Sequence, residues 1–191
     1  MQLRVAQIVE DTEAEGPGHR FALWVQGCSL RCPGCCNPEM FSADKGGALH
    51  DVEALVQRVL AVPGIEGLSV LGGEPFEQPE ALAGLCTRLH EAGRSVMVFT
   101  GYTLTELRAL PSPHVARALA AIDLLVDGRF DAARPDTQRR WIGSTNQTLH
   151  FFTTRYSPSD FNAPNTVELR FENGALTING WPAAADALRR R

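Results

Sequence analysis

The sequence has no apolar run approaching the length of a membrane span, and lysine occurs in it once, at Lys45. Its 191 residues carry 18 basic and 22 acidic side chains, which gives a net charge of −4. A transmembrane helix needs about 20 consecutive apolar residues, and a dedicated nucleic-acid surface usually gives a domain a basic balance. We therefore expect neither a membrane nor a nucleic acid among the partners of this chain.

The first residues also lack the charged and then apolar layout of a secretory signal. The expected location is therefore the cytoplasm, where thiols stay reduced. Four of the five cysteines nevertheless lie together between Trp24 and Met40. In a reducing compartment such a cluster indicates metal binding or thiol redox chemistry rather than a disulfide framework.

The cysteine cluster has the spacing C-x3-C-x2-C at Cys28, Cys32 and Cys35, with Cys36 directly behind. Thiolates bind zinc, copper(I) and iron–sulfur clusters, and a structural zinc site or an electron-transfer cluster usually takes four protein ligands. Three cysteines would leave one iron of a four-iron cluster open to a substrate or cofactor. Two other interpretations stay open from the spacing alone: a zinc site completed by Cys36, and a redox pair formed by Cys32 and Cys35.

Apolar periodicity predicts strands that alternate with helices along most of the chain. The strands are expected over residues 3–9, 21–25, 67–71, 95–99 and 122–126, and the helices begin near residues 51, 79, 104 and 113. This alternation is typical of a parallel sheet built from βαβ units. It leaves room for about five or six strands, fewer than a complete eight-stranded barrel. We expect the first strand to be an edge strand and the acidic segment 10–18 to be a surface loop.

The C-terminal part has a different pattern. Residues 167–171 and 175–178 flank Asn173-Gly174, which is a strong signal for a β-hairpin. The chain is therefore divided into residues 1–150, which hold the α/β part, and a C-terminal extension, 151–191, which packs on the same domain.

Residues suited to chemistry follow several of the expected strands. They are the cysteine cluster, Gly72-Gly73-Glu74-Pro75, Thr100-Gly101 and Asp127-Gly128-Arg129. Ligands of parallel α/β folds bind at the C-terminal edge of the sheet, so these loops are expected to converge there. Paired glycines let a backbone approach a ligand closely, and Glu74 can accept a hydrogen bond from an ammonium group. Taken alone, Glu74 is also compatible with a tight turn that leaves its carboxylate in solvent.

In combination these motifs resemble the radical S-adenosylmethionine superfamily, in particular the small branch that includes the activating enzymes of anaerobic ribonucleotide reductase. The resemblance covers residues 20 to about 150. It is carried by four motifs in order: Cys28-x3-Cys32-Pro-Gly-Cys35-x-Asn37-Pro38, Gly72-Gly73-Glu74-Pro75, 99–103 (Phe-Thr-Gly-Tyr-Thr), and 126–130 (Val-Asp-Gly-Arg-Phe) followed by 143–147.

The resemblance implies an incomplete parallel βα barrel that holds one 4Fe-4S cluster on Cys28, Cys32 and Cys35, while Cys36 is not a ligand. S-adenosylmethionine would chelate the fourth iron. The implied cofactor-binding residues are Gly72, Gly73 and Glu74 at the methionyl amino group, and Thr100, Asp127, Arg129 and Ser144 near the ribose or carboxylate. An external electron donor would reduce the cluster, and cleavage of the cofactor would give a 5′-deoxyadenosyl radical that abstracts hydrogen.

Such an oxidoreductase has two candidate classes of substrate. The first is a protein, a glycyl radical enzyme that the radical activates, and the short barrel leaves its mouth open for a protein loop. The second is a peptide or a small molecule, reached through the same first half-reaction. A non-enzymatic alternative is a zinc-stabilised binding module.

Overall fold

The computed structural model of the protein describes residues 1–172 and 174–181. Its strands are β1 (Gln2–Thr12), β2 (Arg20–Val25), β3 (Ala48–Asp51), β4 (Gly67–Gly72), β5 (Ser95–Phe99), β6 (Leu124–Asp127), β7 (Thr148–Phe151), β8 (Val167–Glu172) and β9 (Ala175–Gly180). The helices are α1 (Val52–Ala61), α2 (Pro79–Glu91), α3 (Leu104–Ala109) and α4 (Pro113–Ala120), with short 3-10 turns at Pro38–Met40, Pro75–Glu77 and Pro158–Phe161. Within these ranges, the protein has no helix that is both long enough and apolar enough to cross a membrane.

Seven strands form one open sheet in the order β3-β1-β2-β4-β5-β6-β7. The strands β2, β4, β5 and β6 run parallel to one another, whereas β1, β3 and β7 pair antiparallel at the two sides. The α/β class with a parallel centre is therefore confirmed. The parallel part has four strands instead of five or six, and the described residues contain no closed barrel, so a partial barrel is not confirmed.

The two flanking strands that the sequence did not predict correct the expected edges. Because β3 pairs outside β1, the first strand is an interior strand and not an edge strand. β3 and β7 are short and largely unburied, so they lack the alternation that predicts a half-buried strand. Only their hydrogen-bonded pairing, of β3 with β1 and of β7 with β6, defines them as strands.

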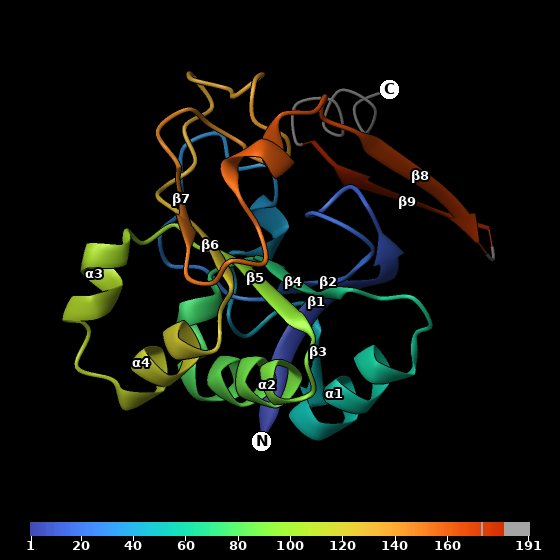
Figure 1. The fold of residues 1–191 in the computed structure, drawn as a ribbon, viewed down its shortest axis with the longest axis vertical. Coiled ribbons are helices and arrows are strands. Elements are labelled where there is room, and N and C mark those ends of the chain that lie inside the picture. Colours follow the sequence, from blue (N-terminus) through green and yellow to red (C-terminus); the bar gives the residue numbers. More distant parts are fainter. Residues whose placement is uncertain (173, 182–191) are drawn as a thin grey trace.

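Each face of the sheet carries its own core. The helices α1, α2 and α4 lie together on one side (Figure 1), and the alternate residues Val96 and Val98 of β5 pack with them. Met97, between those two valines, points to the opposite face and packs with Tyr156 and Phe161 from the segment after β7. The second face is thus covered by irregular chain rather than by helices, which leaves room there for a cavity.

The helices begin where their capping signals predict. The Asp51 carboxylate accepts hydrogen bonds from two backbone N–H groups of the first turn of α1, and Thr103 forms a complete capping box with Glu106 at the start of α3. Pro79 occupies the first turn of α2, and Gly93 just beyond that helix has the left-handed φ of +77° that favours glycine.

A buried polar network joins the second face to the start of the parallel strands. The Arg20 guanidinium is fully buried and donates to the Ser69 and Ser95 hydroxyls and to the Tyr156 hydroxyl. Tyr156 in turn donates to the Glu66 carboxylate. Burial lowers the pKa of Arg20, and the opposing influence of Tyr156 and Glu66 keeps the charge paired. Tyr156 therefore ties the chain after residue 150 to the sheet.

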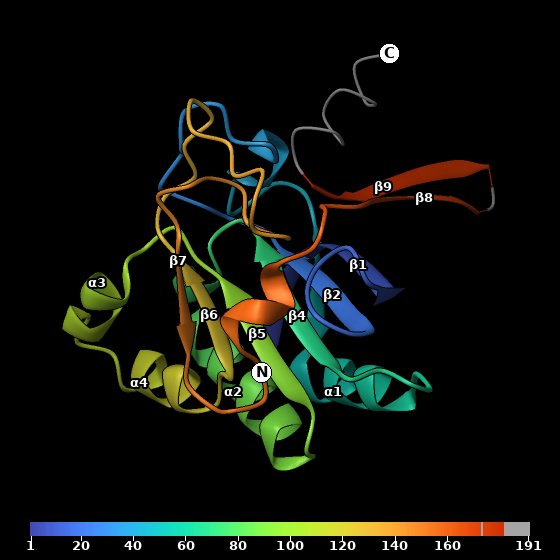
Figure 2. The same ribbon diagram turned by 45° about the horizontal axis from the view of Figure 1, so that its top comes forward.

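The strands β8 and β9 form a separate two-stranded sheet that stands away from the main sheet (Figure 2). The predicted hairpin strands are confirmed. Asn173, which was expected in its turn, and residues 182–191 of the C-terminal extension lie outside the described residues.

Candidate functional site

A cavity lies on the second face of the sheet, where the parallel strands end. The cysteine loop and the loops after β6 are side by side above it (Figures 1 and 2). Its lining combines strand ends, both loops and the base of the hairpin: Gln7, Ala14, Glu15, Trp24, Cys28, Leu30, Cys32, Cys35, Cys36, Asn37, Phe41, Leu71, Gly72, Gly73, Glu74, Phe99, Thr100, Gly101, Gly128, Phe130, Trp141, Gly143, Gln147, Ile178, Asn179, Gly180 and Trp181. The empty space between these residues, including the solvent at its open mouth, is about 1250 Å³.

The four cysteines of the loop all line this cavity, and each is half-buried. The two ends of the loop are held together because Gly27 N–H donates to the Met40 carbonyl at 2.9 Å and Cys28 N–H donates to the Phe41 carbonyl at 3.1 Å. Inside the loop, Cys35 N–H donates to the Cys32 carbonyl at 3.1 Å. The backbone therefore presents the sulfur atoms to one space.

The thiols differ in acidity. Burial raises the pKa of Cys28 and Cys32, whereas a hydrogen bond from the Cys36 thiol lowers the pKa of Cys35 to about 6. The Asn37 N–H, 3.4 Å from the Cys35 sulfur, acts in the same direction. Both contacts favour the thiolate of Cys35, which is the form that binds metals.

The cysteine loop supplies thiolate donors, which suit an iron–sulfur cluster. Among residues 1–172 and 174–181, no three His, Cys, Asp or Glu side chains converge closely enough to hold one metal ion. A four-iron cluster distributes its cysteine ligands over different irons, so it needs sulfur atoms around a wider space. Cys28, Cys32 and Cys35 at the wall of one cavity meet that requirement.

Gly72 and Gly73 bring the end of β4 against the start of the cysteine loop. Gly73 N–H donates to the Val25 carbonyl and Glu74 N–H donates to the Gly27 carbonyl, both at 2.8 Å. A Cβ on Gly73 would lie 2.2 Å from the Gly27 carbonyl oxygen, and Gly72 has a φ of +97°. Only glycine fits at both positions, so this turn and the first cysteine are locked together.

Glu74 is buried, with 1% of its surface exposed, so the solvent-facing alternative for it is wrong. Its carboxylate accepts hydrogen bonds from Phe76 N–H at 3.0 Å, the Thr100 hydroxyl at 2.8 Å and Gly101 N–H at 2.8 Å. Burial nevertheless raises the pKa of Glu74 to about 7, against the lowering effect of these three donors. Within the described part of the chain Glu74 forms no ion pair, so a cationic group of a ligand would find a buried carboxyl there without a counter-charge.

This raised pKa predicts a pH dependence of stability in the metal-free protein. The folded state holds the Glu74 proton up to about pH 7, whereas an unfolded glutamate loses it near 4.5. The stabilisation is complete below that lower pH and is lost as the pH rises through 7, by on the order of 3 kcal/mol. Urea denaturation between pH 5 and 8 measures it, and Glu74→Gln should flatten the slope.

Glu106→Gln is the matched control, because the Thr103 N–H lowers the pKa of that exposed carboxyl. The control should keep the downward slope. If Glu74→Gln keeps it as well, Glu74 is not the group that titrates.

The structure separates the other predicted cofactor-binding residues into two groups. Thr100 lines the cavity, and its hydroxyl is engaged with Glu74. Asp127, Arg129 and Ser144 lie outside the lining: the Asp127 carboxylate accepts from Leu104 N–H at 2.6 Å, Arg129 pairs with Glu106 at 3.2 Å, and the Ser144 hydroxyl accepts from Asp131 N–H at 3.1 Å.

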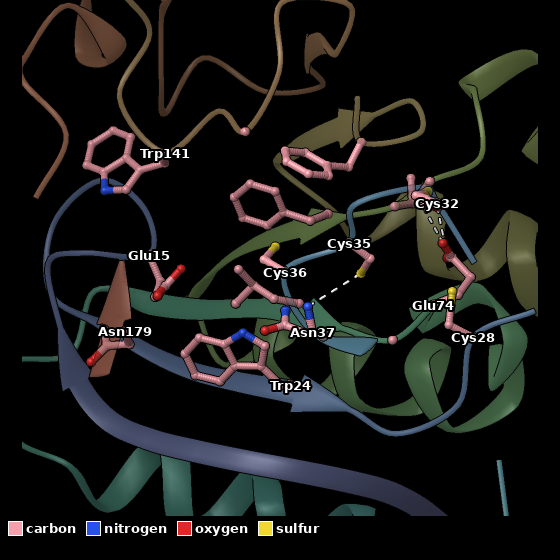
Figure 3. Close-up of a pocket in the computed structure, with 18 of the residues that line it drawn as sticks. Glu15, Trp24, Cys28, Cys32, Cys35, Cys36, Asn37, Glu74, Trp141 and Asn179 are labelled. Carbon is pink, nitrogen blue, oxygen red and sulfur yellow. Dashed lines mark hydrogen bonds between the residues drawn. The ribbon is translucent and has the colours of Figure 1, made fainter. Parts of the chain in front are cut away.

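Two residues of the cavity wall, Glu15 and Asn179, were missed by the sequence reasoning. Glu15, Trp141 and Asn179 lie at the end of the cavity opposite Cys28, Cys32 and Glu74 (Figure 3). Glu15 is buried and accepts from Gly180 N–H, so the acidic segment 10–18 is not simply a surface loop. Its contact joins residues 165 positions apart, and no local signal predicts such a contact.

Trp141 precedes the Gly143-Ser144 motif, and from the sequence a place on the substrate side and a simple packing role were equally open for it; it lines the cavity. The Trp141 backbone has a left-handed φ of +66°. Its backbone N–H donates a hydrogen bond to the side-chain oxygen of Asn165 at 2.7 Å. The indole N–H donates to the Glu13 carbonyl at 3.0 Å, so the ring is fixed at the cavity wall.

Comparison with known proteins gives one family and several relatives. The family described as "4Fe-4S single cluster domain" matches residues 14–150. The anaerobic ribonucleoside-triphosphate reductase-activating protein of Pasteurella multocida is 36% identical over 146 residues, which are 72% of this chain and 90% of that protein. The proteins with the same description from Salmonella typhi and Escherichia coli are 35% and 34% identical, each over 71% of this chain and 90% of the relative.

Proposed function

Because the chain belongs to the 4Fe-4S single cluster family of the anaerobic ribonucleoside-triphosphate reductase-activating proteins, which are radical S-adenosylmethionine oxidoreductases, we propose that it cleaves S-adenosylmethionine reductively and thereby activates a glycyl radical enzyme. The observation that carries the proposal is that three cysteines with the C-x3-C-x2-C spacing line the same cavity as Gly72, Gly73 and Glu74. A metal site and a site for a cationic ligand thus share one space.

In this proposal Cys28, Cys32 and Cys35 hold one 4Fe-4S cluster. When bound, the cluster supplies the electron that cleaves the sulfonium to methionine and a 5′-deoxyadenosyl radical. The turn at Gly72 and Gly73 stays bare of side chains, so its backbone can approach the methionyl group of the cofactor.

Glu74 would accept a hydrogen bond from the methionyl ammonium group. Thr100 and Gly101 hold its carboxylate in place through their two hydrogen bonds. A bound cation also favours the ionised form, so it offsets the burial that raises the pKa of Glu74.

Asp127, Arg129 and Ser144 are proposed to act near the ribose or carboxylate by fixing the loop over residues 128–147. That loop contributes Gly128, Phe130, Gly143 and Gln147 to the cavity. The aromatic side chains of the lining, among them Phe99 and Phe130, would exclude water from the reactive species.

The proposed partner is a protein substrate, because the relatives are described as activating proteins of a reductase. An external electron donor and a cytoplasmic location belong to the same proposal.

Anaerobic reconstitution with iron and sulfide, followed by dithionite and S-adenosylmethionine, tests the proposal. We expect about four irons per chain and 5′-deoxyadenosine as a product, measured by metal analysis and chromatography. Bound zinc with no cleavage of S-adenosylmethionine would contradict it.

A further inference from the structure

The β8–β9 hairpin has an exposed apolar face. Leu169, Phe171 and Leu176 are 58%, 75% and 59% exposed. Leu169 lies opposite Ile178 and Phe171 lies opposite Leu176, and directly opposed residues of an antiparallel pair share one face. We call the three exposed side chains the hairpin strip. Single exposed apolar residues are common, but three on one two-stranded face form a patch.

The other face of the hairpin is polar and is fixed to the end of β1. The Glu168 carboxylate accepts hydrogen bonds from the Thr12 hydroxyl at 2.8 Å and from Glu13 N–H at 2.9 Å. Because the single hydroxyl proton of Thr12 goes to Glu168, the Asn179 amide must donate to Thr12, at 2.9 Å. These bonds set which face of the hairpin is turned away from β1.

The hairpin strip is continuous with the cavity. Ile178, on the same face, is 8% exposed and lines the cavity together with Gly180 and Trp181. Leu176 is two residues further along β9, about 7 Å away at the rise of a strand. An apolar path therefore leads from the cavity wall out along the hairpin.

We propose that the hairpin strip docks an extended polypeptide segment of the protein substrate, next to the residue that enters the cavity. This rests on the proposed function, in which the substrate is a protein. A segment with apolar side chains can lie on Leu169, Phe171 and Leu176 while the chain beside it passes Ile178 into the cavity. A second copy of this chain on the strip would instead cover the approach to the cavity.

The hairpin lies outside the part of the chain that the family match covers. The family match ends at residue 150, whereas β8 begins at Val167. The strip therefore adds a contact surface outside the matched region, and none of its three side chains lines the cavity.

The test is a variant that carries both Phe171→Ser and Leu176→Ser, made in the full chain. Its dissociation constant for the anaerobic ribonucleoside-triphosphate reductase of the same organism should rise about tenfold or more, measured by fluorescence anisotropy under argon. Formation of 5′-deoxyadenosine with dithionite should stay within about twofold of the wild type. Leu49→Ser on β3 is the matched control, because Leu49 is 59% exposed and lies opposite Arg4 near the start of β1, whereas the hairpin is held at the other end of that strand.

An unchanged dissociation constant in the double variant would overturn the docking proposal, and so would an equal loss in Leu49→Ser or no binding by the wild type. Sedimentation of the protein alone provides a further check: a wild-type dimer that the double variant loses would assign the strip to a second copy. Failure of the proposed function would show separately, as absence of 5′-deoxyadenosine from the wild type, while the binding measurement still reports on the strip.

Discussion

Alanine at any one of Cys28, Cys32 or Cys35 is expected to abolish cluster assembly, whereas Cys36→Ala is expected to retain about four irons per chain. All four cysteines line one cavity, so their position alone does not distinguish the cluster ligands from Cys36. The division follows from the C-x3-C-x2-C spacing, which Cys28, Cys32 and Cys35 complete without Cys36. Iron content and the visible absorbance of the reconstituted proteins measure the result.

The Cys36 variant is the informative member of this set. The Cys36 thiol lowers the pKa of Cys35, so its removal leaves Cys35 more protonated. Assembly should therefore be slower at neutral pH and should recover at higher pH, with full iron content at the end. Loss of the cluster at every pH would place Cys36 in the ligand set.

The second large effect is expected from Gly73→Ala. A Cβ at this position would lie 2.2 Å from the Gly27 carbonyl oxygen, and a backbone atom cannot yield as a flexible side chain does. The turn and the cysteine loop must separate, which should destabilise the fold by about 1–3 kcal/mol. Affinity for S-adenosylmethionine should fall about 100-fold, since displacement of a positioning group by about 1 Å can cost that much.

Gly64→Ala is the matched control for this substitution. Gly64 also has a left-handed φ, +77°, but a Cβ there meets nothing within 4 Å. It should cost about 1 kcal/mol of stability from the backbone conformation and leave cofactor binding unchanged. Equal affinity in Gly73→Ala and the wild type, measured by equilibrium dialysis, would rule out this turn as the cofactor site.

The sequence was sufficient where the signal is local. The start of α1 at the Asp51 cap and the start of α3 at the Thr103 capping box were predicted because each cap is formed within a few residues. Glycine pairs and cysteine spacing are local in the same sense. They predicted the loops that meet at the C-terminal edge of the parallel strands.

The sequence was insufficient where the determining contact is distant. Nothing near Glu74 indicates that Thr100 and Gly101 enclose its carboxylate, and nothing near Glu15 indicates that Gly180 lies against it. The edges of the sheet were not predicted for a related reason. The edge strands β3 and β7 are defined by the neighbours that they pair with, and those pairings leave the sheet open.

The hydrogen bond from the Arg20 guanidinium to the Tyr156 hydroxyl also determines when the core can close during synthesis of the chain. It spans 136 positions, and at 5–20 residues per second a ribosome takes on the order of ten seconds to make that length. Throughout that interval the cysteine loop has emerged, but the buried guanidinium beneath the parallel strands has no tyrosine to accept its hydrogen bond. A nascent chain therefore displays its cysteines before it can close its core, and the cavity that a cluster would enter is completed only when the final fifth of the polypeptide arrives.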